Sequence, residues 1–323
     1  MERITSWLLK EPVGVMPILD KWILFFLKII YLGIRFSVKI ALGKKRRDRL
    51  YVKRGIHFND SFGPSFYFMS FLYKVIKFLR LGNPVSLKIS VPKYNYKVLC
   101  PIKKEEIMHM TIREDHIIEH FTPKQGDVVV DIGAHMGRYT IIGAKRVGAQ
   151  GKVVAIEANP SNFEMLNRNI KLNRLTNIIS LNNAVYSKET KIKLYLPGEE
   201  LGDTIYNTII SDRAKNEDKF VEVSANTLDY LLQSKGIKHE QVNWIKIDVE
   251  GAEFEVIKGA TNILSNSKDI ALLIEIHNLK DSTNLYRPII EFLKLYNFKI
   301  EFEKTYDGGE KHIIVRKQQT MKT

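Results

Sequence analysis

A chain of 323 residues that is 45% hydrophobic and 27% charged can bury one large α/β domain with an appendage, or two modest domains. Its single cysteine, Cys100, excludes a disulfide framework and a cysteine-rich zinc site, and favours a reducing, cytoplasmic compartment. The formal charge of +14 is concentrated at the start: residues 1–82 hold 16 of the 50 Lys and Arg but 5 of the 36 Asp and Glu, which leaves 34 against 31 for the rest. This balance argues against a body that binds nucleic acid, because such a domain carries its own basic surface.

The basic segment 1–82 also holds 15 of the 33 aromatic side chains. Within it, residues 22–42 have the length of a membrane span, but Lys28, Arg35 and Lys39 interrupt the roughly 20 apolar residues that a span requires. On a helix these cations fall on one narrow stripe. The pattern predicts an amphipathic helix in the headgroup layer of an anionic membrane, peripheral on the inner face of the cell membrane. Docking on the rest of the chain or on a partner chain, and a true span, are the alternatives.

The pattern changes after residue 82 and predicts one α/β domain over residues 83–323. A hairpin of 85–91 and 94–99 and a short helix over 111–121 come first. Apolar runs typical of strands then alternate with helical patterns, which predicts a doubly wound, mainly parallel sheet covered on both faces. The predicted main strands are 127–132, 152–157, 178–182, 242–248, 270–276, 298–302 and 312–316. The predicted helices are 138–147, 160–172, 253–264 and 284–296.

Two further features refine this fold. Residues 191–196 and 220–225 read as an extra strand pair before a helix over 227–233. The last two strands are separated only by a turn around Gly308, so they form a C-terminal antiparallel hairpin. The predicted fold is therefore Rossmann-like, with an N-terminal amphipathic helical segment ahead of it.

A strand that ends in an acid and a glycine turn carries the first chemical signal. Asp131 ends the strand, Gly133 follows in the turn, and Gly137 opens the next helix. In such sheets ligands bind at the carboxyl ends of the strands, so we expect Gly133 to let the backbone approach a ligand and Gly137 to pack the helix start. The dinucleotide spacing G-x-G-x-x-G is absent, and Asp131 would repel a pyrophosphate. Both features disfavour a nicotinamide-dependent oxidoreductase.

Three more strands deliver polar side chains to the same edge of the sheet. Glu157 ends the second strand, where a carboxylate can accept both hydroxyls of an adenosine ribose. Asp248 ends the strand expected beside the first one. The strand that follows delivers Glu275 and His277. We expect these groups to face one crevice.

The runs VVVDIGAHMGRYT, VVAIEANP, NNAV, WIKIDVEGAEFEVIKGA and LLIEIH, in this order, resemble the FkbM-type methyltransferase family. The resemblance covers about residues 111–316 and implies a class I, Rossmann-like enzyme that uses S-adenosylmethionine. It implies a methyl transfer, usually to an oxygen of a sugar, polyketide or glycan. It also implies the cofactor residues: Asp131, Gly133, Ala134 and Gly137 at the methionine part, Glu157 at the ribose with Ala158 and Asn159 beside it, and Asn183 and Ala184 near the adenine.

His135 stands where many class I enzymes have a third glycine, and we assign it to the cofactor site while leaving contact with the acceptor open. The candidates for catalysis are His277, Asp248 and Glu250. We favour His277 as a neutral general base, because an ordinary imidazole has a pKa near 6.5, and Asp248 as a group that orients cofactor or acceptor. We assign no metal, although a divalent ion at Asp248, Glu275 and His277 is an alternative.

The acceptor is expected to be a small molecule or glycan, lipid-linked if the N-terminus rests on a membrane, and not a nucleic acid. Residues 191–225 are expected to form a lid specific for the acceptor, since loops on a fixed scaffold commonly determine specificity. A nucleic-acid methyltransferase, and a non-catalytic membrane-associated protein that retains the fold, are the alternative functions.

Overall fold

The computed structural model describes residues 86–101, 104–111, 113–196, 220–277, 285–306 and 309–318. The predicted amphipathic helix of segment 1–82 lies outside these residues. Among the residues that are described, no helix combines the length and the apolar character needed to cross a bilayer.

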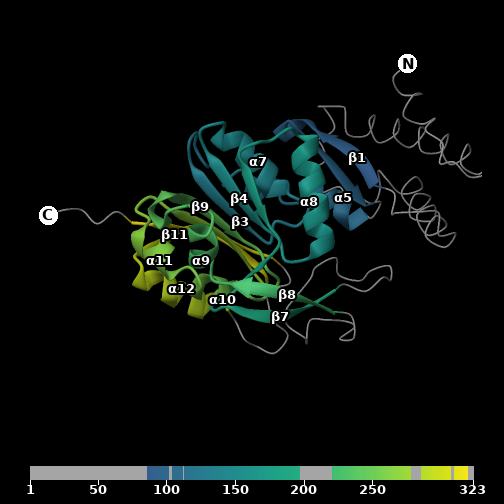
Figure 1. Ribbon diagram of the computed structural model, residues 1–323. Helices are drawn as coiled ribbons and strands as arrows, with labels where there is room; N and C mark the ends of the chain where they lie inside the picture. The colour runs from purple at the N-terminus through teal and green to yellow at the C-terminus, as the bar shows by residue number, and fades with distance from the viewer. Residues whose placement is uncertain are drawn as a thin grey trace, which may run out of the picture. The chain divides into compact units, whose positions relative to one another are not determined.

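A seven-stranded sheet forms the centre of the domain (Figure 1). Its strands, in spatial order, are β11 (Phe298–Thr305), β12 (Lys311–Lys317), β10 (Ala271–Ile276), β9 (Val242–Ile247), β3 (Val128–Ile132), β4 (Lys152–Ile156) and β5 (Ile178–Leu181). Neighbours from β10 to β5 are parallel, and β12 runs antiparallel to both β10 and β11. This order confirms the predicted doubly wound sheet with a C-terminal antiparallel hairpin, and it places β9 beside β3 as expected.

Helices cover both faces of this sheet (Figure 1). On one face, α9 (Leu228–Gln233), α10 (Glu253–Lys258), α11 (Thr261–Asn266) and α12 (Tyr286–Leu295) bury apolar side chains in one core with Val130 and Ile132 of β3. On the other face lie α7 (Arg138–Val147) and α8 (Pro160–Leu172). Because side chains alternate along a strand, Asp131 faces α7, where Thr140 Oγ1 donates a hydrogen bond to it.

The bounds predicted for α7 and α8 are confirmed, but the predicted helix 253–264 is broken into α10 and α11. Gly259 lies at the break, where a Cβ atom would be 2.2 Å from the backbone oxygen of Tyr186. The carboxylate of Asp229 accepts hydrogen bonds from the backbone N–H groups of Asn262 and Ile263. In a continuous helix these N–H groups would donate to carbonyls of the preceding turn, so the Asp229 carboxylate takes the place of those carbonyls at the start of α11.

The expected N-terminal hairpin is present as β1 (Ser86–Val91) and β2 (Tyr96–Pro101), an antiparallel pair. The helix predicted over 111–121 is wrong: α5 (Lys104–Thr111) ends where that helix was expected to begin, and α6 (Asp115–Ile118) is a single turn. Arg138 explains the turn between them. Its guanidinium donates to the carbonyls of His109 and Thr111 and to the Asp115 carboxylate, so it ties the end of α5 and the start of α6 to α7.

The extra strand pair forms a separate three-stranded sheet. In it, β8 (Phe220–Asn226) lies between β6 (Ala184–Val185), which is parallel to it, and β7 (Thr190–Tyr195), which is antiparallel. The connection 197–219, the middle of the predicted acceptor lid, lies outside the described residues.

Candidate active site

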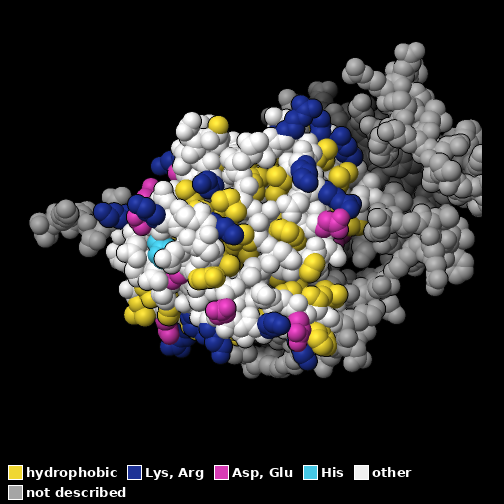
Figure 2. Space-filling model, viewed as in Figure 1, with side chains coloured by type: hydrophobic (Ala, Val, Ile, Leu, Met, Phe, Trp, Pro, Cys, Tyr) yellow, Lys and Arg dark blue, Asp and Glu magenta, His cyan; other side chains and the backbone are white. Residues whose placement is uncertain are grey.

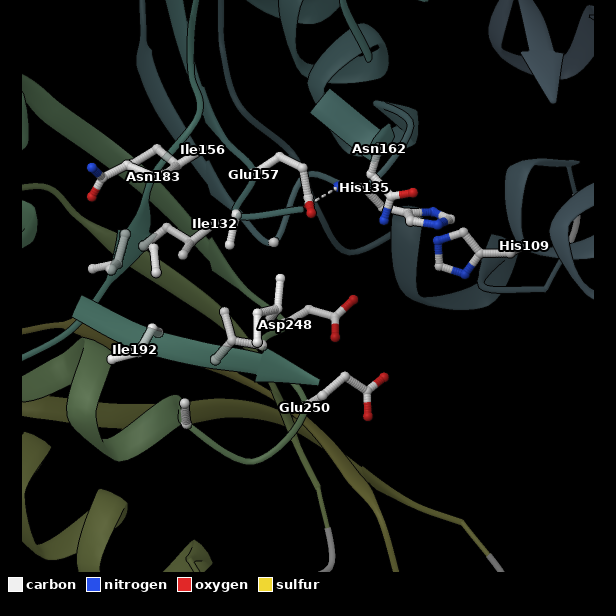
Figure 3. Close-up of a pocket in the computed structure, with 17 residues that line it drawn as sticks. His109, Ile132, His135, Ile156, Glu157, Asn162, Asn183, Ile192, Asp248 and Glu250 are labelled. Atoms are coloured by element: carbon white, nitrogen blue, oxygen red, sulfur yellow. Dashed lines mark hydrogen bonds between the residues drawn. The ribbon is translucent and has the colours of Figure 1, made fainter. Parts of the chain in front are cut away.

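A pocket opens at the carboxyl ends of β3, β4 and β9, and its space, including the part open to solvent, is about 750 Å³. Eight of the residues singled out from the sequence line it: Gly133, His135, Glu157, Ala158, Asn183, Ala184, Asp248 and Glu250. Figure 3 shows Asn183 and Ile192 toward one end of the pocket and His109, His135 and Glu250 toward the other.

The glycine turn after β3 packs closely against the chain at the end of β9. Gly133 has φ +72°, and a Cβ atom there would lie 1.7 Å from the backbone oxygen of Asp248. Glycine is therefore required because the end of β9 passes against the turn, and Gly133 also lines the pocket, where the expected approach to a ligand stays a prediction. Gly137 has φ +97° and lies against Leu166 of α8, which agrees with its expected packing role.

The turn also fixes the acid at the tip of β4. The backbone N–H of His135 donates to Oε2 of Glu157 at 2.7 Å (Figure 3). The backbone N–H of Asn159 donates to Oε1 of the same carboxylate at 2.9 Å. His135 adopts the left-handed conformation with φ 50°. This conformation is unfavourable for a residue with a Cβ, and such strain concentrates at functional sites. Burial raises the pKa of the Glu157 carboxyl.

Asp131 was expected at the cofactor, but its side chain lies behind the pocket wall. It is 1% exposed, accepts a hydrogen bond from Thr140 and lies 3.8 Å from Nζ of Lys246. Strand alternation is the reason, because Ile132 takes the position that faces the pocket. Three other predicted cofactor residues are likewise buried or packed next to the wall without lining it: Ala134, Gly137 and Asn159, the last as N-cap of α8.

A buried lysine, missed from the sequence, joins the two acids of β3 and β9. Nζ of Lys246 lies 3.0 Å from Oδ2 of Asp248 and donates to the Gly133 carbonyl at 3.1 Å. Burial works against both charges, but the Lys246 ammonium outweighs it and holds the pKa of Asp248 well below its usual range. The two carboxylates in turn raise the pKa of Lys246. The wall of the pocket therefore carries a charged carboxylate at Asp248. The only signal in the sequence was a lysine inside an apolar strand.

His277 follows β10 and is surrounded by carboxylates. Its Nδ1 lies 2.7 Å from Oε1 of Glu253, and its Nε2 lies 3.3 Å from Oε2 of Glu250 and 3.9 Å from Oδ1 of Asp248. Burial disfavours the charged ring, but the carboxylates of Glu250 and Glu253 outweigh it and raise the pKa of His277 well above its usual range. These carboxylates therefore favour the protonated ring, whereas the sequence analysis expects a neutral imidazole base, and that role stays a prediction. His277 is 3% exposed and does not itself line the pocket.

Sequence reasoning also missed the contribution of α5. His109 lines the pocket with its ring centroid 5.0 Å from that of His135, and Glu106 Oε2 lies 3.5 Å from Nε2 of His135. Burial lowers the pKa of His109 to about 3. No motif indicated these residues, since α5 precedes β3, the first strand that carries one. From β7, Ile192 and Leu194 add apolar wall.

The arrangement therefore has an apolar part and an acidic part. Carboxylates at Glu157, Asp248 and Glu250 can accept hydrogen bonds from hydroxyl groups and balance a cationic ligand. Ile132, Ile156 and Ile192 offer a dry surface for a planar ring.

Comparison with known proteins assigns this site to a family. Residues 131–300 match the sequence model of the methyltransferase FkbM domain. Methyltransferase sdnD of Sordaria araneosa is 27% identical over 196 residues, which are 53% of this chain and 74% of that protein. Methyltransferase 1 of Beauveria bassiana (strain ARSEF 2860) is 25% identical over 168 residues, which are 48% of this chain and 66% of that protein.

A crystal structure of methyltransferase FkbM from Methylobacillus flagellatus KT is 18% identical, with a TM-score of 0.40, over 59% of this chain and 43% of that chain. The chain thus spans less than half the length of that protein. Because the family's sequence model covers slightly more than half of the 323 residues, the chain belongs to the FkbM family of S-adenosylmethionine-dependent methyltransferases.

Proposed function

We propose that the chain transfers the methyl group of S-adenosylmethionine to a hydroxyl oxygen of a sugar, glycan or lipid-linked small molecule. The observation that carries the proposal is the fixed carboxylate of Glu157 at the tip of β4, held by two backbone N–H groups and lining the pocket. A carboxylate oriented in this way is suited to the two hydroxyls of a ribose.

In this proposal the cofactor extends along the pocket from its apolar end. The adenine lies near Asn183 and Ala184, the ribose hydroxyls bind Glu157, and the methionine part lies against the turn at Gly133 and His135. Support comes from the apolar wall around Asn183 and from the acids beyond the turn, which can balance the ammonium and sulfonium charges.

The acceptor then lies at the acidic end, near Asp248 and Glu250. In the transfer, the carbon–sulfur bond of the cofactor breaks as the acceptor oxygen forms a bond to the methyl carbon. S-adenosylhomocysteine leaves, and the hydroxyl proton passes to a carboxylate of this end of the pocket. Holding oxygen, carbon and sulfur in line in a site with little water supplies much of the rate. His277 contributes here through its contacts with Glu250 and Asp248, which orient these two carboxylates.

Calorimetric titration of the full chain with S-adenosylhomocysteine tests the cofactor part. We expect micromolar binding that Glu157→Gln weakens about 10- to 100-fold, because a charged acceptor of hydrogen bonds becomes neutral. Glu164→Gln, an exposed carboxylate on the same region of chain in α8, is the matched control and should bind as the parent does. Absence of binding by folded parent protein would refute the proposal and favour a non-catalytic protein that retains the fold.

The acceptor class has a separate test. Incubation with isotope-labelled cofactor and a panel of sugars, lipid-linked glycans, tRNA and duplex DNA should label a hydroxyl-bearing small molecule or glycan. Fragmentation by mass spectrometry then distinguishes O-methylation from N-methylation. Figure 2 shows charges of both signs interspersed over the visible face of the described domain, in agreement with a non-nucleic acceptor. Labelling of the nucleic acids alone would overturn this part.

A peripheral position on a membrane is proposed for the segment 1–82 from its charge and its aromatic content. Flotation of the full chain with vesicles that contain anionic lipid should carry the protein to the top of a gradient, and neutral vesicles should carry much less. Equal recovery in the soluble fraction with both vesicles contradicts the proposal.

A further inference from the structure

Two carboxylates and one imidazole converge beside the acceptor end of the pocket. Asp248, Glu250 and His277 each offer an atom within 4.8 Å of the other two. They come from the end of β9, the turn after it, and the end of β10, so the fold brings them together from two strands. Figure 3 shows the carboxylates of Asp248 and Glu250 directed toward the same end of the pocket as His109.

We propose that Asp248, Glu250 and His277 bind a divalent metal cation, whose open coordination positions face the pocket and bind the acceptor oxygen. The cation site stands on these three residues alone, while its role toward the acceptor rests on the proposed function.

The orientation of His277 is the second observation in favour of the site. Its Nδ1 is held by Oε1 of Glu253 at 2.7 Å, and the same oxygen accepts the backbone N–H of Gly251 at 2.9 Å. Nε2 is thereby directed at Glu250 and Asp248, and a cation that binds there takes the place of the proton on Nε2. Histidines that bind metals almost always donate their other ring N–H to a carboxylate or carbonyl, which fixes the ring. Glu253 is 0% exposed, and its Oε2 has no hydrogen-bond partner in the described part of the chain.

Local charge also favours a cation. Besides Asp248, Glu250 and Glu253, the carboxylate of Glu275 lies 3.8 Å from the His277 ring, so four acids surround one imidazole. Lys246 pairs with Asp248, and His312 Nε2 lies 3.2 Å from Glu275. These contacts offset part of the negative charge, and a divalent ion offsets the remainder. Buried charges without compensation are costly, so such a cluster is stabilised by an ion.

The donor set indicates the class of metal. Carboxylates suit Mg²⁺ and Mn²⁺, whereas imidazole suits Zn²⁺ and Fe²⁺, so a mixed set of two carboxylates and one imidazole fits Mn²⁺ or a similar first-row ion. Three protein ligands leave positions for a substrate oxygen, and a bound cation lowers the pKa of the hydroxyl it holds. A second convergent group, Glu114, Glu275 and His312, does not line the pocket and is not part of this site.

A titration of the metal-free full chain with Mn²⁺ tests the site. Electron paramagnetic resonance measures the free ion at each step and thus the amount that is bound. We expect one ion per chain, with affinity at least tenfold weaker in Glu250→Gln and in His277→Gln. Glu253→Gln changes a residue that positions His277, and it should weaken the affinity for Mn²⁺ about 10- to 100-fold. Glu164→Gln on exposed α8 should leave Mn²⁺ affinity unchanged. Circular dichroism establishes whether each variant is folded. If His277→Gln does not fold, Glu250→Gln still tests the site.

Two results overturn the inference: no binding of Mn²⁺, Mg²⁺ or Zn²⁺, or stoichiometric binding that Glu250→Gln and Glu253→Gln leave unchanged. Calorimetry with S-adenosylhomocysteine on metal-free protein separates this failure from failure of the proposed function. Cofactor binding without metal binding refutes only the cation site, whereas metal binding without cofactor binding refutes the function and leaves the cation site standing.

Discussion

The backbone N–H of His135 and the carboxylate of Glu157, 2.7 Å apart, join the turn after β3 to the tip of β4. The residue that donates this hydrogen bond adopts φ 50°, in the left-handed region that is unfavourable for a residue with a Cβ. One strained residue thus sets the position of the acid that we assign to the ribose.

We predict that His135→Val lowers stability by about 1–3 kcal/mol, because a β-branched residue is strongly disfavoured at this φ. Displacement of the N–H should also weaken the binding of S-adenosylhomocysteine by about tenfold, which is the effect of one hydrogen bond to a charged group. His135→Asn is the matched control, since asparagine adopts the left-handed conformation more readily. Urea unfolding and calorimetry measure the two effects, and equal values for the Val and Asn variants would show that the backbone conformation is not what matters.

Gly133→Ala should be far more damaging than an alanine at another glycine with positive φ. At Gly133 the new Cβ would overlap the Asp248 carbonyl, which is backbone and cannot rotate away, so we expect a loss of about 3 kcal/mol or more. Gly126 also has positive φ but has no atom within 4 Å of the new Cβ. Gly126→Ala should therefore cost only about 1–2 kcal/mol of backbone strain. Similar unfolding midpoints for both variants would contradict the close contact.

His109 should make the protein sensitive to acid. In the folded chain its pKa is lowered to about 3, whereas an unfolded histidine takes up a proton near its ordinary value of 6.5. Between these values the unfolded state binds more protons, so the free energy of unfolding falls as the pH falls, by at most about 1.4 kcal/mol per pH unit. The contribution of His109 to the free energy of unfolding is therefore complete above about pH 6.5 and is lost progressively below it.

The comparison of urea unfolding at pH 7 and pH 5 measures this effect. His109→Gln should lose less stability than the parent over the same interval, and replacement of the exposed His120 by Gln should leave the parent's dependence unchanged. The assignment to His109 fails if all three proteins lose the same amount.

The main sheet, α7, α8 and the acid at the tip of β4 could be predicted because their signals are local. Asp131 and the glycine turn come directly before α7, and Glu157 with Asn159-Pro160 comes directly before α8. The break between α10 and α11 could not be predicted, because it depends on Tyr186 and Asp229, which are remote in the sequence. The charge of His277 and the contribution of His109 also depend on distant partners, Glu250 and Arg138 among them.

Lys246 is the clearest case of a role that only the fold reveals, and it leads to a further prediction. Lys246→Met removes the ammonium that lies near Asp131 and Asp248, and both carboxylates then remain buried without it. Breaking a buried pair by removing one partner costs about 3–5 kcal/mol, whereas a surface pair contributes about 0–1 kcal/mol. Arg168→Met, which removes the partner of Glu164 on the exposed face of α8, is therefore the matched control.

The same variant separates stability from binding. Without Lys246 the pKa of Asp248 should rise, because the largest influence that lowers it is gone while burial, which raises it, remains. In the variant, a buried carboxyl with a raised pKa destabilises the folded state while the pH is above that pKa, and this penalty disappears as the pH falls and the carboxyl takes up a proton. Lys246→Met should accordingly unfold at lower urea than the parent at pH 7, and the gap should narrow as the pH is lowered toward 4. A constant gap would mean that lost packing of the lysine side chain, and not its charge, accounts for the destabilisation.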